Sequence, residues 1–148
     1  MPTMSSGMDA ETRERLAGPA VRAFFRITEV WGLTDQQRLV MLGESVGRST
    51  LPVWKEQPPR TLSRDQLERC SYVVGIYEGV TRIFRRDPTL GLRWLRLPRP
   101  EFPFLGMSAL AYMLEGRMQQ LADVRAYVDQ LNGGPPSREE YPAPTREA

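Results

Sequence analysis

The chain has 148 residues, of which 41% are hydrophobic and 26% charged, a composition typical of a soluble globular protein and too apolar for a disordered one. It contains no histidine, one lysine and one cysteine, which excludes the usual Ser–His, Cys–His and zinc sites. We therefore expect no enzymatic activity, no metal and no cofactor. Neither a long apolar run nor a signal-peptide pattern is present, so we expect a cytoplasmic protein in which Cys70 is a buried, unpaired side chain.

Both ends of the chain are predicted to lie outside the fold. We expect residues 1–18 to form a flexible N-terminal segment and residues 134–148, which follow Gly133 and are rich in proline and glutamate, to form a disordered tail. Between them, apolar residues recur at helical spacing and no stretch alternates as a strand would. The sequence therefore predicts an all-α fold.

Residues 19–60 are predicted to form a helix-turn-helix domain. A first helix runs over 19–31, and a second follows the capping box of Thr34 and Gln37 and closes at Gly43. A third short helix follows Ser49 as N-cap, with Pro52 in its first turn. Two short helices around a glycine-containing turn are typical of the DNA-binding motif, although a plain helical hairpin would show the same pattern.

The second short helix of such a motif presents its N-terminal residues to base edges in the major groove. Arg48, Ser49 and Thr50 are therefore the candidate DNA-binding residues, with Lys55 near the phosphate backbone. Pro52 shortens this helix and removes one backbone donor, which weakens the case for specific base contacts.

Residues 61–133 are predicted to form a second helical domain. Ser63 and Gln66 form another capping box, which opens a long, strongly periodic helix to about Arg85 that we expect at the centre of the core. A short helix follows Asp87 through residue 95, and a proline-rich loop covers 97–104. Two more helices end near 116 and 131.

Arginines are concentrated between residues 82 and 99, with Asp87 as the only acid there. Such a cluster suits a phosphate or an acidic protein surface, and it is equally typical of a solvated helix face. The six arginines are Arg82, Arg85, Arg86, Arg93, Arg96 and Arg99.

Several short motifs occur in a characteristic order and spacing: Trp31-Gly32-Leu33-Thr34-Asp35, Ser49-Thr50, Trp54-Lys55, Asp87-Pro88, Trp94-Leu95 and Leu105-Gly106-Met107-Ser108. In these motifs residues 20–134 resemble the Xre/MbcA/ParS antitoxin family. Val46-Gly47, Pro52 and the loop Phe102–Leu105 depart from the family pattern. The resemblance implies a C-terminal half that binds and inhibits a RES-domain toxin, an enzyme that degrades NAD. It also implies homodimerisation and repression of the protein's own operon through operator DNA.

Arginine and aromatic residues are common interface anchors, so the toxin-binding candidates come from the arginine cluster, the proline-rich loop and the turn near Gly116. Phe104 and Met107 are equally candidates for core side chains. An acidic group (Glu115, Asp123 or the pair Glu139-Glu140) could instead mimic the phosphates of a dinucleotide. The candidate toxin-binding residues are Arg93, Arg96, Phe104, Met107, Arg117 and Met118.

Two other functions remain open at this stage. One is a stand-alone helix-turn-helix transcriptional regulator without a toxin partner. The other is an antitoxin that acts only by protein contact and has lost DNA binding.

Overall fold

A computed structural model describes residues 9–43 and 45–134, and in this part of the chain it contains seven α-helices. The only β-type pairing in these ranges is a single bridge between Pro98 and Ser108, so the all-α prediction is confirmed. None of the described helices is long and apolar enough to cross a membrane. The helices are α1 (Ala10–Val30), α2 (Asp35–Leu42), α3 (Thr50–Glu56), α4 (Arg64–Ile83), α5 (Pro88–Arg96), α6 (Ala109–Met113) and α7 (Met118–Leu131).

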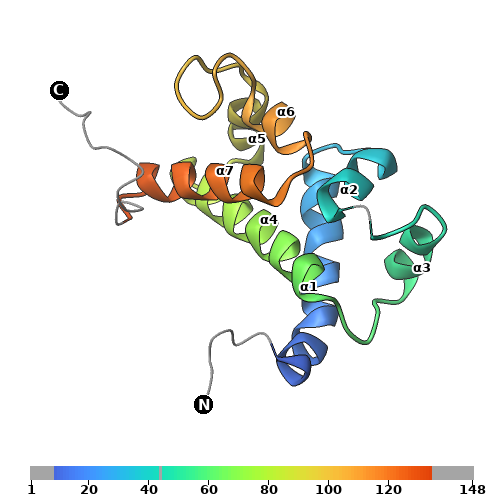
Figure 1. The fold of residues 1–148 in the computed structure, drawn as a ribbon. Coiled ribbons are helices and arrows are strands. Elements are labelled where there is room, and N and C mark those ends of the chain that lie inside the picture. The colour runs from blue at the N-terminus through green and yellow to red at the C-terminus, as the bar shows by residue number, and fades with distance from the viewer. Residues whose placement is uncertain (1–8, 44, 135–148) are drawn as a thin grey trace.

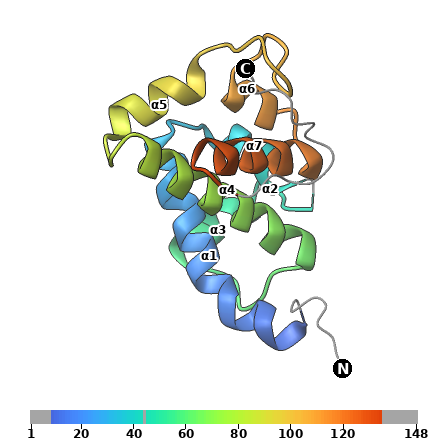
Figure 2. The ribbon, with the colours of Figure 1, turned by 90° about the vertical axis from the view of Figure 1, so that its left-hand side faces the viewer.

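Helix α4 lies at the centre, with α1 packed on one side and α7 on another (Figures 1 and 2). Its buried residues include Val73 and Ile76, both fully shielded from solvent. The predicted capping box opens it, with Ser63 Oγ accepting from Gln66 N and Gln66 Oε1 accepting from Ser63 N. The prediction of a central helix is therefore confirmed, with an end at Ile83 instead of Arg85.

The N-terminal prediction was wrong for residues 10–18, which form the first turns of α1 instead of a flexible segment. Asp9 caps the helix by accepting from Thr12 N at 2.9 Å, and Arg13 Nε donates to Leu62 O at 3.0 Å. Pro19 lies inside the helix, where it leaves the carbonyl of Arg15 without its usual donor. Both residues lie on the exposed side, so water can hydrogen-bond that carbonyl.

Helices α2 and α3 begin where the sequence predicts. Thr34 and Gln37 form the capping box of α2, and α3 follows Ser49 with Pro52 as its third residue. Ser49, however, makes no side-chain capping bond. The turn between the helices is instead closed by Thr50 N donating to Gly47 O at 3.1 Å.

Helices α5 and α6 also begin at their predicted caps. Asp87 Oδ1 accepts from Thr89 N and Leu90 N at the start of α5, and Ser108 Oγ accepts from Ala111 N at the start of α6. The loop between them is ordered by Arg99 N donating to Met107 O at 3.1 Å.

A single buried cluster contains residues from both halves of the chain. Phe24 comes from α1, Trp31 is the C-cap of that helix, and Leu121 comes from α7. Cys70 lies inside this cluster, and burial raises the pKa of its thiol to about 12. It is therefore a small apolar core residue, as predicted.

Candidate functional site

The turn before α3 holds two of the four candidate DNA-binding residues in solvent. Val46, 6% exposed, and Leu51, 1% exposed, anchor the turn and the helix in the core. Arg48 and Ser49, between these anchors, are exposed and have no side-chain hydrogen bond or ion pair within the described residues. Thr50 is half-buried beside them. The structure therefore brings Arg48, Ser49 and Thr50 together at one end of α3.

Lys55, the fourth candidate, is engaged within the protein. Its Nζ lies 3.3 Å from Asp35 Oδ1 and 5.9 Å from the centroid of the Phe25 ring. The side chain thus ties α3 to the start of α2 and to α1, and it remains 44% exposed. The contact of Lys55 with the DNA phosphate backbone stays a prediction. Such a contact would compete with the internal ion pair between Lys55 and Asp35.

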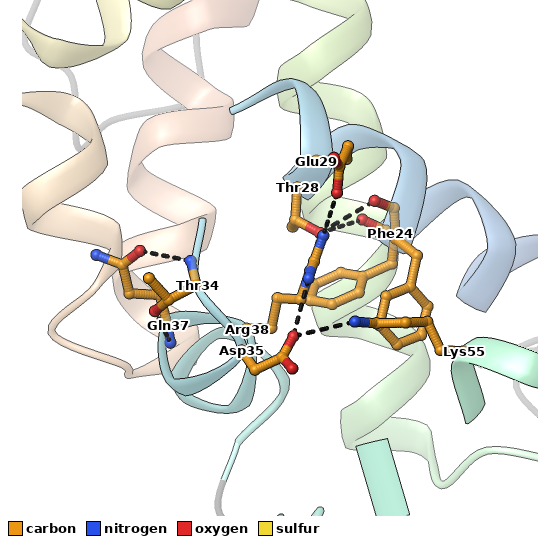
Figure 3. A network of polar contacts seen from close by, with 9 residues as sticks. Phe24, Thr28, Glu29, Thr34, Asp35, Gln37, Arg38 and Lys55 are labelled. Carbon is orange, nitrogen blue, oxygen red and sulfur yellow. Dashed lines mark hydrogen bonds and ion pairs between the residues drawn. The ribbon is translucent and has the colours of Figure 1, made fainter. Parts of the chain in front are cut away.

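Arg38 organises the same corner of the protein, as Figure 3 shows. Its Nε donates to Thr28 Oγ1 at 2.8 Å, and its other nitrogens lie 2.9 Å from Asp35 Oδ1 and 3.2 Å from Glu29 Oε1. The hydrogen bond from Arg38 is the main reason why the pKa of Asp35 is lowered, and Lys55 lowers that pKa further. Only 5% of Arg38 is exposed, so it is a structural residue of the motif.

Sequence reasoning missed Arg38, although one signal was present. The residue lies one turn before the buried Met41 and Leu42, on the face of α2 that points to the core. A charged residue at such a position is buried only when it is paired, which is what the three partners provide.

The outward side of α3 carries little positive charge. Pro52, Val53 and Glu56 are exposed there, with Val53 60% accessible. An exposed valine can contact a thymine methyl group, whereas Glu56 repels phosphates. Arg48 is therefore the cation most available to DNA at this end of the motif.

Two of the candidate toxin-binding residues, Arg117 and Met118, line a shallow groove of about 510 Å³ between α2 and the start of α7. Arg69 lies in the groove and joins its walls, because its Nη1 donates to Met41 O at 3.2 Å and to Gly116 O at 3.0 Å. Its Nε donates to Asp65 Oδ2 at 2.9 Å. Sequence reasoning missed this buried arginine as well.

Arg93 and Arg96 line a different hollow, of about 410 Å³, with Val30 and Leu92. Arg93 is exposed, whereas Arg96 Nη2 donates to Trp31 O at 2.8 Å and thereby fastens α5 to the end of α1. The two pairs of candidates thus lie in separate hollows.

The structure places Phe104 in the core, 1% exposed, with its ring edge-on to Tyr112 and Tyr127. The prediction that Phe104 contacts a toxin is therefore corrected, because its ring is fully buried and offers no surface to a partner. Met107 is half-buried. The two most exposed large apolar side chains of the loop are Phe102 and Leu105, 62% and 72% accessible, and neither is among the six candidate toxin-binding residues.

The acidic candidates for phosphate mimicry have partners within the protein. Asp123 accepts from Tyr112 Oη at 2.6 Å and from Gln119 Nε2 at 2.8 Å. Glu115 accepts from Gln120 Nε2. Glu139 and Glu140 lie outside the described residues.

Comparisons with known proteins agree with this architecture. Residues 11–75 match the model of the antitoxin Xre-like helix-turn-helix domain, a range that ends within α4 and includes the turn at Arg48. The chain is also 38% identical over 114 residues to the uncharacterized protein y4oB of Sinorhizobium fredii, an alignment that covers 77% of this chain and 84% of that protein. Residues 11–75 are thus an antitoxin Xre-like helix-turn-helix domain, the motif of a DNA-binding antitoxin or regulator, and the chain belongs to the same family as y4oB.

Proposed function

We propose that this protein is an antitoxin that binds and neutralises a RES-domain, NAD-degrading toxin through its C-terminal half and represses its own operon through its helix-turn-helix. The observation that carries the proposal is the antitoxin-type motif over residues 11–75, with Arg48 and Ser49 exposed at the start of α3 and without a side-chain partner among the residues that the structure describes. Residues 76–134, outside the family match, form α5 to α7 and the end of α4, and we assign the toxin-binding role to this part of the chain.

The first experiment is co-purification with the product of the neighbouring gene, followed by an NAD-consumption assay on that product alone and in complex. We expect a stable complex and NAD consumption only by the separated partner. A partner without this activity would contradict the RES assignment, and no partner at all would favour a stand-alone regulator.

The two hollows give alternative toxin-facing surfaces that charge reversal can separate. Arg117→Glu changes the groove between α2 and α7, and Arg93→Glu changes the hollow between α1 and α5. Both residues are exposed, so both variants should fold. We expect at least one of them to restore NAD consumption in the mixture, and an intact complex with both would remove these two surfaces from the proposal.

DNA binding is tested on the protein's own promoter by gel shift and by its salt dependence. Arg48→Ala should weaken binding by about fivefold or more, since one good arginine contact to a base contributes about 1–3 kcal/mol. Arg93→Ala, which removes the same charge far along the chain, is the matched control and should leave binding unchanged.

A second candidate is an antitoxin that acts by protein contact alone. The charge-poor face of α3 and the internal ion pair of Lys55 favour it. It predicts a tight toxin complex with no salt-dependent affinity for the promoter. Homodimerisation, the remaining part of the proposal, is tested by sedimentation of the free protein.

A further inference from the structure

The end of α4 carries three exposed arginines, Arg82, Arg85 and Arg86, which we name the arginine corner. They line a hollow of about 560 Å³ together with Tyr77, Glu78 and Thr81. Within residues 9–43 and 45–134, none of the three forms an ion pair. Their guanidinium groups are therefore available to an anionic partner, with a tyrosine and a threonine hydroxyl beside them.

The backbone of the corner is held in a conformation that arginine rarely adopts. Arg85 and Arg86 follow one another at φ +54° and +68°, in the left-handed region that ordinarily ends a helix with a single glycine. Arg86 N donates to Thr81 O at 2.8 Å, which fixes this turn. Glycine would relieve the strain at both positions, so this sequence places two arginines where the backbone disfavours them, which points to a role outside the fold.

The corner lies far from the DNA-binding end of the protein. The first turn of α4 touches the turn before α3, because Gln66 Nε2 donates to Ser45 Oγ at 3.0 Å. The 20 residues of α4 then carry the chain about 30 Å away at the usual helical rise. Figure 1 shows α3 and the far end of α4 on opposite sides of the molecule. A duplex bound along α3 would leave the corner uncovered.

We infer that the arginine corner docks an acidic surface of the partner toxin, so that the toxin and operator DNA can be bound at the same time. The inference rests on the proposed function for the existence of that partner. Arginine pairs with carboxylates through two parallel hydrogen bonds. The three arginines outnumber the one acid that lines the hollow, Glu78, so the surface keeps a positive charge that complements an acidic partner. Tyr77 supplies the aromatic contact common at protein interfaces.

The test uses the double variant Arg85→Gly/Arg86→Gly in the full chain. Because glycine fits the left-handed conformation, the melting temperature should be unchanged or higher. Affinity for the neighbouring gene's product should fall by about tenfold or more, as for truncated interface charge pairs. The wild-type complex should also weaken between about 50 and about 200 mM salt, and the variant complex much less. Promoter binding should not change.

Arg15→Gln/Arg22→Gln is the matched control, because it removes the same charge from exposed positions on α1. It should leave the toxin complex intact. Normal toxin binding by the glycine variant, or a loss equal to that of the control, would overturn the inference while leaving the proposed function in place.

Two further outcomes would also be decisive. A lower melting temperature with unchanged binding would show that the arginines serve the end of α4, and weaker promoter binding would make the corner a DNA contact. Either result overturns the docking role. A wild-type protein that binds no such partner would overturn the proposed function first, and this inference with it.

Discussion

Arg38 shows how a buried charge can position the two short helices of the motif. Three acceptors from α1 and α2 surround its guanidinium group, and two of them, Glu29 and Asp35, keep their carboxylates largely in water, 82% and 55% exposed. The acids therefore lose little hydration, while Arg38 gains the hydrogen bonds that burial demands. Asp35 also forms an ion pair with Lys55 of α3, so its carboxylate connects α2 with α3.

The lowered pKa of Asp35 predicts a pH-dependent contribution to stability. Because the folded protein holds this pKa below its ordinary value of 3.8, the ionised carboxylate stabilises the fold above that pH. The contribution is lost as the pH falls through the lower, folded-state pKa. Asp35→Asn should therefore reduce the melting temperature at neutral pH, and the difference from wild type should shrink below pH 3.8, measured by circular dichroism.

A double-mutant cycle identifies the source of this effect. In an Arg38→Gln background, Asp35→Asn should lower the melting temperature by less than it does in the wild type, because its main partner is gone. Equal effects in both backgrounds would mean that the hydrogen bond from Arg38 does not stabilise the ionised carboxylate.

At the scale of elements, the contact between α4 and α7 depends on a glycine. A Cβ added at Gly79 would lie 2.3 Å from Val128 Cγ1, whereas one at Gly75 would meet only the mobile end of Arg125. Gly79→Ala should cost about 1 kcal/mol or more, because overpacking against a stiff valine exceeds the gain in helix propensity. Gly75→Ala should be close to neutral in the same urea titration. Destabilisation by both variants to the same degree would contradict this account.

Arg69 joins three elements, so we expect its replacement to cause a larger loss of stability. Replacing it with methionine fills the space but leaves Met41 O and Gly116 O without their donor in a partly buried groove. The free energy of unfolding should fall by about 2 kcal/mol, the cost of unsatisfied buried acceptors. Arg69→Lys should recover only part of this, since one ammonium group does not reproduce the arginine fork. Full recovery by lysine would show that charge alone matters.

Elements whose signals are local were predictable from the sequence. Thr34, Ser63, Asp87 and Ser108 all cap helices as predicted, because a cap is decided within four residues. The start of α1 was not predictable in this way, since Gly18 and Pro19 disfavour helix locally and the contact of Arg13 with Leu62 spans 49 residues. Tertiary contacts outweighed local preference there.

At the scale of the whole molecule, the candidate DNA-binding residues depend on local sequence, whereas the candidate toxin-binding residues depend on tertiary packing. Arg48, Ser49 and Thr50 are neighbours in sequence, so finding them together required only the turn. The toxin-facing candidates come from α5, a loop and α7, and the packing of these elements distributes them over two hollows and the core. The periodicity of apolar residues predicts which face of each helix is buried, but it does not predict which helices pack against one another.

The shared core predicts that the two halves unfold together. Helix α4 packs against α1 and α7, and Arg69 and Arg96 connect residues on either side of the predicted boundary at residue 60. Trp94→Phe leaves Trp31 and Trp54 as fluorescence probes of the N-terminal half. Their urea transition should coincide with the loss of total helix seen by circular dichroism, as in two-state unfolding. Two separated transitions would mean that residues 61–133 fold as an independent domain, and a partner could then alter one half without the other. Coincident transitions would instead couple toxin binding to the stability of the DNA-binding motif, because any ligand of the folded state stabilises the whole cooperative unit.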